Sequence, residues 1–159
     1  MTHAEILAAL SAGSPDRQAA AQQAMHQGED AGPVAAVLAA HTGDSDIGEP
    51  CIAALEKCGP PAADQLPALT ALLADTELPA YWAATLIGRL GADGAAATAA
   101  LAATAASRQP LAVRERAVWA LGKIGPAANA ALPALESLID SPQPRLARLA
   151  KQAVAAISG

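Results

Sequence analysis

The chain has 159 residues and a formal net charge of −5 at pH 7, and hydrophobic residues make up 53% of it. Only 2% of the residues are aromatic, none is phenylalanine, and 46 are alanine. This length fits one domain with a real core. Alanine is the best intrinsic helix former, and no alternating strand pattern runs for more than a few positions. The composition therefore excludes a β-rich fold and predicts an all-α domain.

Leader, membrane and disulfide signals are missing from the sequence. No apolar run of about twenty residues is free of charge or proline, so we expect no membrane span. The first residues include Glu5 and no basic segment, which argues against a secretory signal. Cys51 and Cys58 lie seven positions apart on one expected helix, about 10 Å between Cα atoms, which is too far for a disulfide. We expect a cytoplasmic protein with two inert, buried thiols.

Start signals mark the first elements in chain order. Thr2 and Glu5 match a capping box at the start of a lone helix over about residues 3–12. Ser14-Pro15 then predicts the cap and first turn of the next helix, and Asp46 is the expected cap of a later one.

Glycines divide the chain into units of about 32 residues, a period typical of helical repeat arrays. They are Gly28, Gly59, Gly91 and Gly125, and Gly125 is expected to adopt a left-handed backbone past the end of its helix. The same apolar positions lie eight, four and one residues before each glycine. They are Ala117, Leu121 and Ile124; Ala83, Ile87 and Leu90; Cys51, Leu55 and Cys58; and, more weakly, Ala20, Ala24 and Gln27.

The second helix of each unit repeats as well. Leu66-Pro67-Ala68-Leu69 matches Leu132-Pro133-Ala134-Leu135, and the prolines predict helices that begin late or kink. We expect one domain over residues 1–159. Its segments are a leading helix in 1–13, helix pairs in 14–45, 46–77, 78–108 and 110–141, and a trailing helix in 142–159.

The best-preserved unit is Val113 to Asp140, VRERAVWALGKIGPAANAALPALESLID. It resembles the short HEAT-like repeat, the variety also found in phycobilin lyases and in many bacterial repeat proteins. A tetratricopeptide repeat needs core Tyr and Phe, and an ankyrin repeat needs a Thr-Pro-Leu-His turn, so neither fits. The resemblance implies a right-handed α-solenoid of about four helix pairs with a lone capping helix at each end. First helices would form its convex wall and second helices its concave wall.

Charge is distributed unevenly along the chain. Residues 1–80 carry two basic and eleven acidic residues, a net charge of −9, whereas residues 81–159 carry eight and four, a net charge of +4. A dipolar surface of this kind can steer a partner or align copies. The plainer interpretation of this charge distribution is a solvated surface without a binding role. We expect the protein to be a monomer, and end-to-end association of copies is the alternative.

No catalytic, metal-binding or cofactor-binding motif is found, and none of these sites is predicted. The three histidines, His3, His26 and His41, lie in the weakest repeats and are interpreted as solvated or capping residues. Some HEAT-like proteins are DNA glycosylases, but those need a basic concave cleft. The second helices here carry acidic and small polar residues instead, so nucleic-acid binding is not expected. The concave candidates for partner binding are Asp64, Asp75, Ser137 and Asp140.

Aromatic residues are concentrated on two neighbouring first helices. Helical spacing points Tyr81 and Trp119 away from the buried stripe, near Arg116, and Trp82 to the side. Trp, Tyr and Arg are enriched in interface hot spots, so Tyr81, Trp119 and Arg116 are the convex candidates for partner binding. The alternative is that Trp119 folds down over small neighbours and only thickens the wall.

The sequence therefore favours a non-enzymatic scaffold that presents a curved helical surface to another protein. The alternatives are a chromophore-lyase-like protein, implied only by the resemblance, and a purely structural subunit of a larger assembly.

Overall fold

The computed structural model describes all residues, 1–159, and the chain is entirely helical. Four 3₁₀ segments join ten α-helices. The α-helices are α1 (His3–Ser11), α2 (Arg17–Gln27), α3 (Ala35–Ala40), α4 (Gly48–Lys57), α5 (Leu66–Leu72), α6 (Glu77–Arg89), α7 (Thr98–Ala106), α8 (Leu111–Ile124), α9 (Leu132–Leu138) and α10 (Pro144–Ser158). The 3₁₀ segments are η1 (Gly28–Val34), η2 (Ala63–Gln65), η3 (Gly91–Ala97) and η4 (Gly125–Ala131).

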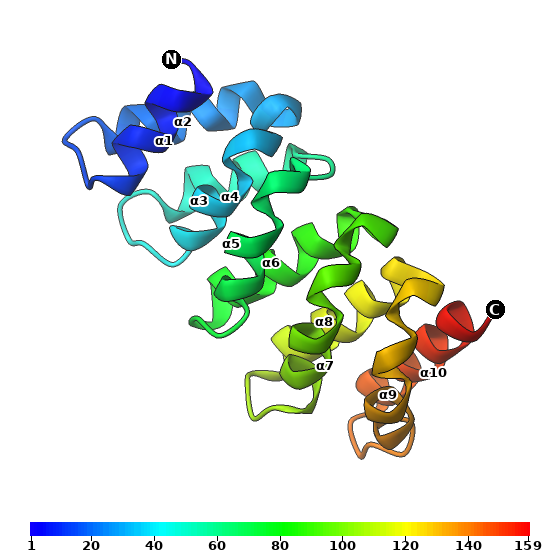
Figure 1. Cartoon of the computed structure of the whole chain (residues 1–159). Coiled ribbons are helices and arrows are strands. Elements are labelled where there is room, and N and C mark those ends of the chain that lie inside the picture. Colours follow the sequence, from blue (N-terminus) through cyan, green and yellow to red (C-terminus); the bar gives the residue numbers. More distant parts are fainter.

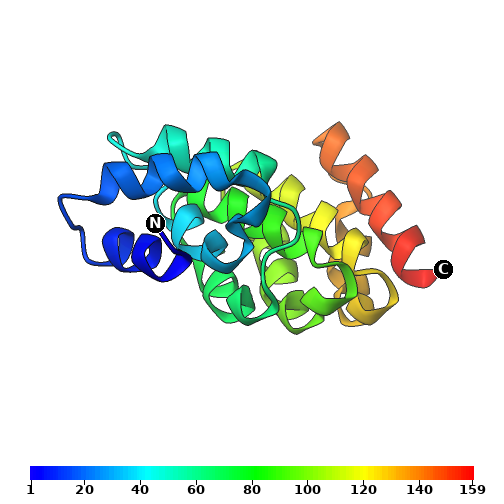
Figure 2. The ribbon, with the colours of Figure 1, turned by 90° about the horizontal axis from the view of Figure 1, so that it is seen from above.

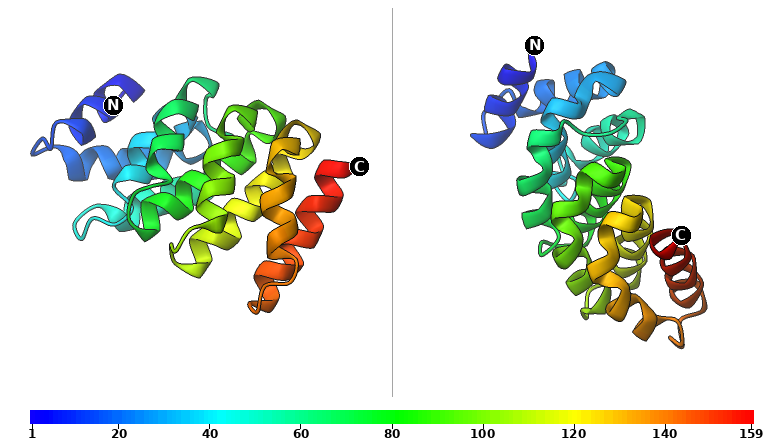
Figure 3. Two further views of the ribbon diagram at one scale, coloured as in Figure 1. Left: turned by 60° about the horizontal axis from the view of Figure 1, so that its bottom comes forward. Right: turned by 45° about the vertical axis from the view of Figure 1, so that its right-hand side comes forward.

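The helices stack into an elongated array with the two termini at opposite ends, as Figures 1 and 2 show. The first helices are α2, α4, α6 and α8, with α10 continuing their row, and the second helices are α3, α5, α7 and α9. Successive helices follow one another in steps along the array in both views of Figure 3. The prediction of an all-α solenoid is confirmed. The side formed by α2, α4, α6, α8 and α10 is termed the first-helix face, and the opposite side the second-helix face.

The repeated apolar stripe forms the core. Leu121, Leu55 and Ile87 are fully buried, and so are the residues at the stripe positions before them, Ala117, Cys51 and Ala83. Small residues let neighbouring helices approach closely: a Cβ added to Gly122 of α8 would stand 3.3 Å from the Cα of Ala153 in α10. Because each helix buries its stripe against the next unit, the core runs the length of the array.

Gly125 adopts the left-handed backbone that was predicted for it, with a positive φ angle. Gly28 and Gly91 do the same, and the three glycines open the 3₁₀ segments η1, η3 and η4. Gly59 differs from them, because α4 ends with an extended Cys58 and Gly59 has no positive φ.

The start signals have mixed outcomes. The capping box of Thr2 and Glu5 is present at α1, and α5 and α9 begin late, with proline in the first turn. Neither Ser14 nor Asp46 caps a helix. Instead, the side-chain Oγ of Ser14 accepts a hydrogen bond from the backbone N–H of Asp16, the residue just before α2.

None of the helices combines the length and the apolar character that crossing a membrane requires.

Candidate functional site

The aromatic residues lie together on the first-helix face of the C-terminal part. Tyr81 and Trp82 are on α6, and Trp119 is on α8, which packs directly on α6. Trp82 is buried, and its ring meets that of Tyr81 edge to face at 5.8 Å. Tyr81 and Trp119 are half-buried, so neither side chain lies in the core and neither is fully exposed.

The ring of Trp119 folds down onto α6, which is the alternative geometry that the sequence left open. The residue beneath it is Gly88: a Cβ added there would stand 2.3 Å from Cζ3 of Trp119. Only glycine at position 88 leaves room for the Trp119 ring. Trp119 is therefore held in place from below while its outer edge remains open to solvent.

Arg116 joins the two half-buried rings. Its guanidinium carbon lies 4.8 Å from the ring centroid of Tyr81 and 4.8 Å from that of Trp119. The guanidinium also donates a hydrogen bond to the hydroxyl oxygen of Tyr81. Stacking and hydrogen bonding together limit the motion of three long side chains. Lys123, one turn further along α8, completes the arrangement with its Nζ 5.7 Å from the Trp119 centroid. Tyr81, Arg116, Trp119 and Lys123 are termed the aromatic–cation cluster.

Trp119 forms a wall of three separate surface depressions. One, of about 260 Å³, lies between α8 and α10 and is lined mainly by apolar residues. A second, of about 380 Å³, lies on the side of Tyr81 and Arg116, and a third, of about 530 Å³, on the side of Gly59 and Arg89. A partner that occupied any of the three depressions would therefore contact Trp119.

No hydrogen bond or ion pair joins the second-helix candidates to one another. Asp64, Asp75, Ser137 and Asp140 are all exposed. Asp75 accepts a bond from the backbone of Thr76 at 2.6 Å, and Ser137 donates to the carbonyl of Pro133 at 3.1 Å, so both are engaged locally. Asp64 contacts only the neighbouring side chain. The structure thus brings together the candidates of the first-helix face but not those of the second-helix face.

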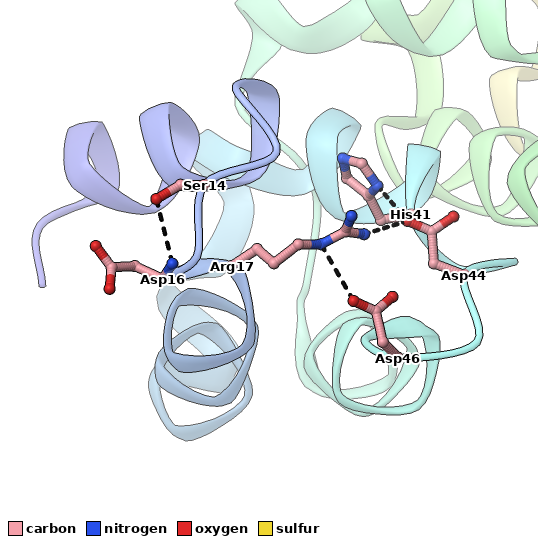
Figure 4. Close-up of polar contacts among 6 residues, drawn as sticks. All are labelled: Ser14, Asp16, Arg17, His41, Asp44 and Asp46. Atoms are coloured by element: carbon pink, nitrogen blue, oxygen red, sulfur yellow. Dashed lines mark hydrogen bonds and ion pairs between the residues drawn. The ribbon is translucent and has the colours of Figure 1, made fainter.

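A polar cross-link in the N-terminal part was not predicted from the sequence. Arg17 at the start of α2 pairs with Asp44 at 2.5 Å and with Asp46 at 3.4 Å, both in the loop before α4 (Figure 4). His41 is the C-cap residue of α3, as the capping interpretation allows, and its Nδ1 also lies 2.7 Å from Oδ2 of Asp44. Burial alone would raise the pKa of Asp44, but the hydrogen bonds from His41 and Arg17 outweigh it and hold this pKa below its usual value of 3.8.

The two cysteines are free and buried. Burial raises the pKa of the Cys51 thiol to about 12 and also raises the pKa of Cys58. Both thiols therefore stay protonated near neutral pH and are poor nucleophiles. No group of three or more His, Cys, Asp or Glu side chains is arranged to hold a metal ion.

Arg89 closes the end of α4, a role that was not predicted from the sequence. Its guanidinium donates to the carbonyl oxygens of Leu55 at 2.7 Å and Cys58 at 2.5 Å. It also lies 5.8 Å from the Trp82 centroid. Arg89 thereby supplies donors to carbonyls at the end of a helix that has no glycine turn.

Comparisons with known proteins add little to these observations. No family model matches the chain, and no curated protein matches it. Among solved structures, a designed armadillo repeat protein matches over 96% of this chain and 98% of its own, with 16% identity and a TM-score of 0.31. A likeness at this level carries no argument about function, and the description as a helical repeat rests on the helices themselves.

Proposed function

We propose that this chain is a HEAT-like scaffold that binds another protein through the aromatic–cation cluster on its first-helix face. The HEAT-like assignment is supported by the stripe repeated before each glycine and by the matching Leu-Pro-Ala-Leu runs. The proposed units are residues 14–45, 46–77, 78–108 and 110–141, between a leading and a trailing helix.

The observation that carries the proposal is the position of Trp119. Its ring is seated on Gly88, stacked on Arg116 and bordered by three depressions. Hot-spot residues are typically aromatic or arginine side chains that are already ordered before binding, because little entropy is then lost on association. Trp119, Tyr81 and Arg116 satisfy this description, whereas the second-helix candidates are short, dispersed and locally bonded.

The other functions have less support. A chromophore-lyase-like role would need polar and aromatic groups converging on the second-helix face, and no hydrogen bond or ion pair joins Asp64, Asp75, Ser137 and Asp140 to one another there. A purely structural subunit would bind its neighbours regardless of Trp119.

The test is capture of a partner from an extract of the native organism by the wild-type chain and by Trp119→Ala. We expect one stoichiometric protein that the wild type retains and the variant loses. Ser137→Ala, on the second-helix face, is the matched control and should retain it. Circular dichroism checks that each variant is folded, and Trp119→Leu, which keeps apolar packing on Gly88, replaces Trp119→Ala if that variant does not fold.

Two results would contradict the proposal. Retention of the same protein by a folded Trp119→Ala variant would remove the cluster from the binding site. A pigment that copurifies in place of a protein would favour the lyase-like function.

A further inference from the structure

The cations around Trp119 have no carboxylate partners. Arg89 bonds to backbone carbonyls, Arg116 stacks between two rings, and Lys123 is exposed beside the indole. The ion pairs of the chain are confined to Arg17, His41 and Arg145 with their carboxylates. Three positive charges on this face are therefore left without a matching negative charge.

Glu115, the only carboxylate of α8, does not neutralise these cations. Glu115 pairs with Arg145 of α10, with Nε and Oε2 3.3 Å apart. These two residues line the depression beside Tyr81 and neutralise each other there. Arg116 also lines that depression, stacked on both rings, whereas Lys123 and Arg89 lie together on the other side of Trp119.

An apolar depression adjoins this charge. It lies between α8 and α10 and is lined by Val118, Trp119, Gly122, Lys123, Leu149, Gln152, Ala153 and Ala156. Gly122 lets the two helices approach closely at its floor, and Lys123 and Gln152 stand at its rim. An apolar side chain that enters this depression would be removed from water and packed against apolar residues, with the cation of Lys123 at the edge.

We infer that the partner of this scaffold presents an acidic segment with an apolar side chain, which seats between α8 and α10 while neighbouring carboxylates meet Lys123 and Arg116. The inference rests on the proposed function and specifies the chemistry of the partner at that same site. The apolar contact supplies affinity, and the charges supply orientation and a faster association rate.

The charge distribution of the whole chain favours an acidic protein segment over a nucleic acid. A nucleic acid presents many phosphates over a long surface, and its affinity depends on many basic contacts. Residues 1–80, with a net charge of −9, would repel such a polyanion along the first half of the array. A short acidic segment needs only the local patch.

The fluorescence of Trp119 provides the test. The chain has two tryptophans, and the Trp119→Phe variant gives the emission of the buried Trp82 to be subtracted. The probe is a short synthetic peptide of Glu and Ala with one central Leu, titrated at low salt. We expect saturable binding that weakens when the central Leu is Ala and when salt is raised, since salt screens exposed charges.

Charge reversals locate the binding site. Lys123→Glu should weaken peptide binding about tenfold, whereas Arg108→Glu, an equal charge change at an exposed position after α7, should leave it within about twofold. Both positions are exposed, so neither variant is expected to lose its fold.

Four outcomes would overturn the inference: no binding of the acidic peptide, equal binding of the corresponding Lys peptide, tighter binding of a single-stranded oligonucleotide, or Trp119 emission that changes with protein concentration alone. The last outcome would identify a second copy of the chain as the occupant. If a native partner still depends on Trp119 while the peptide fails, this inference falls and the proposed function stands. If no partner depends on Trp119, the proposed function falls as well.

Discussion

The two parts of the array are held together in different ways. In the N-terminal part, which consists of the short helices α1 to α4, Arg17, Asp44, Asp46 and His41 link the start of α2 to the loop between α3 and α4 (Figure 4). In the C-terminal part, the longer helices α6, α8 and α10 pack directly on one another. In the first part, Arg17, His41, Asp44 and Asp46 form internal ion pairs. The second is held mainly by apolar contacts, which leaves Arg116 and Lys123 available at the surface.

Between the two parts, the row of first helices is less continuous. α2 packs on α4, and α6 on α8, whereas α6 reaches the N-terminal part mainly through α3 and α5. Arg89 crosses from α6 to the end of α4. A repeat array can therefore be held together by different contacts in its two parts while one apolar core runs through both.

The largest expected effects come from the shared core. Leu55→Ala in α4 and Leu121→Ala in α8 each remove a fully buried side chain and should lower the free energy of unfolding by about 2–5 kcal/mol. Because repeats contact only their neighbours, hydrogen exchange should rise mainly around α2 to α4 in the first variant and around α6 to α10 in the second. Equal loss of protection throughout the chain in both variants would show that the two parts unfold as one unit.

An intermediate effect is expected at the junction. Arg89→Ala leaves carbonyls of Leu55 and Cys58 without their donor and should cost about 1–3 kcal/mol, measured by urea denaturation. Arg89→Lys should recover part of this loss, because an ammonium group can still donate to a carbonyl. A cost for Arg89→Ala no larger than for Arg108→Ala would show that this bridge does not stabilise the junction.

A smaller effect is expected from the N-terminal cross-link. Arg17→Ala should cost about 0.2–1 kcal/mol, because the ion pairs are partly exposed. The pKa of Asp44 is lowered in the folded chain, so its stabilisation is present above pH 3.8 and is lost as pH falls through the lower folded value. Thermal denaturation as a function of pH should therefore show a steeper acid loss in the wild type than in Asp44→Asn. Identical acid profiles would contradict this role.

The smallest effect on stability is expected at the seat of Trp119. In Gly88→Ala the new methyl group displaces the ring, while alanine favours the helix by about 1 kcal/mol, so the net change should stay within about 1 kcal/mol. The displaced indole should be more solvated and its emission shifted to longer wavelength. Gly43→Ala, where the nearest atom would be 3.9 Å away, is the control and should leave the emission unchanged. An unshifted spectrum in Gly88→Ala would show that the ring is not seated on Gly88.

The architecture could be predicted because its signals are local in sequence. Glycines with positive φ, late prolines and a stripe of period 3.6 each act within one helix or turn. The end of α4 could not be predicted, because the hydrogen-bond donors to its last carbonyl groups come from Arg89, which lies 31 residues after Cys58. In the other units a glycine turn ends the helix. The burial of Trp119 depends likewise on the missing side chain of Gly88 in the preceding unit. The ion pairs of Asp44 and Asp46 depend on Arg17, which lies more than twenty residues earlier in the chain.

The unusual geometry at Gly59 has a practical consequence. This glycine is exposed, has no positive φ, and has open space where a Cβ would stand. It also lines the depression that Trp119 borders. Since the native thiols of Cys51 and Cys58 are buried, Gly59→Cys would create a single reactive attachment point for a dye or spin label. Occupancy of the first-helix face could then be followed by spectroscopy without altering the cluster itself.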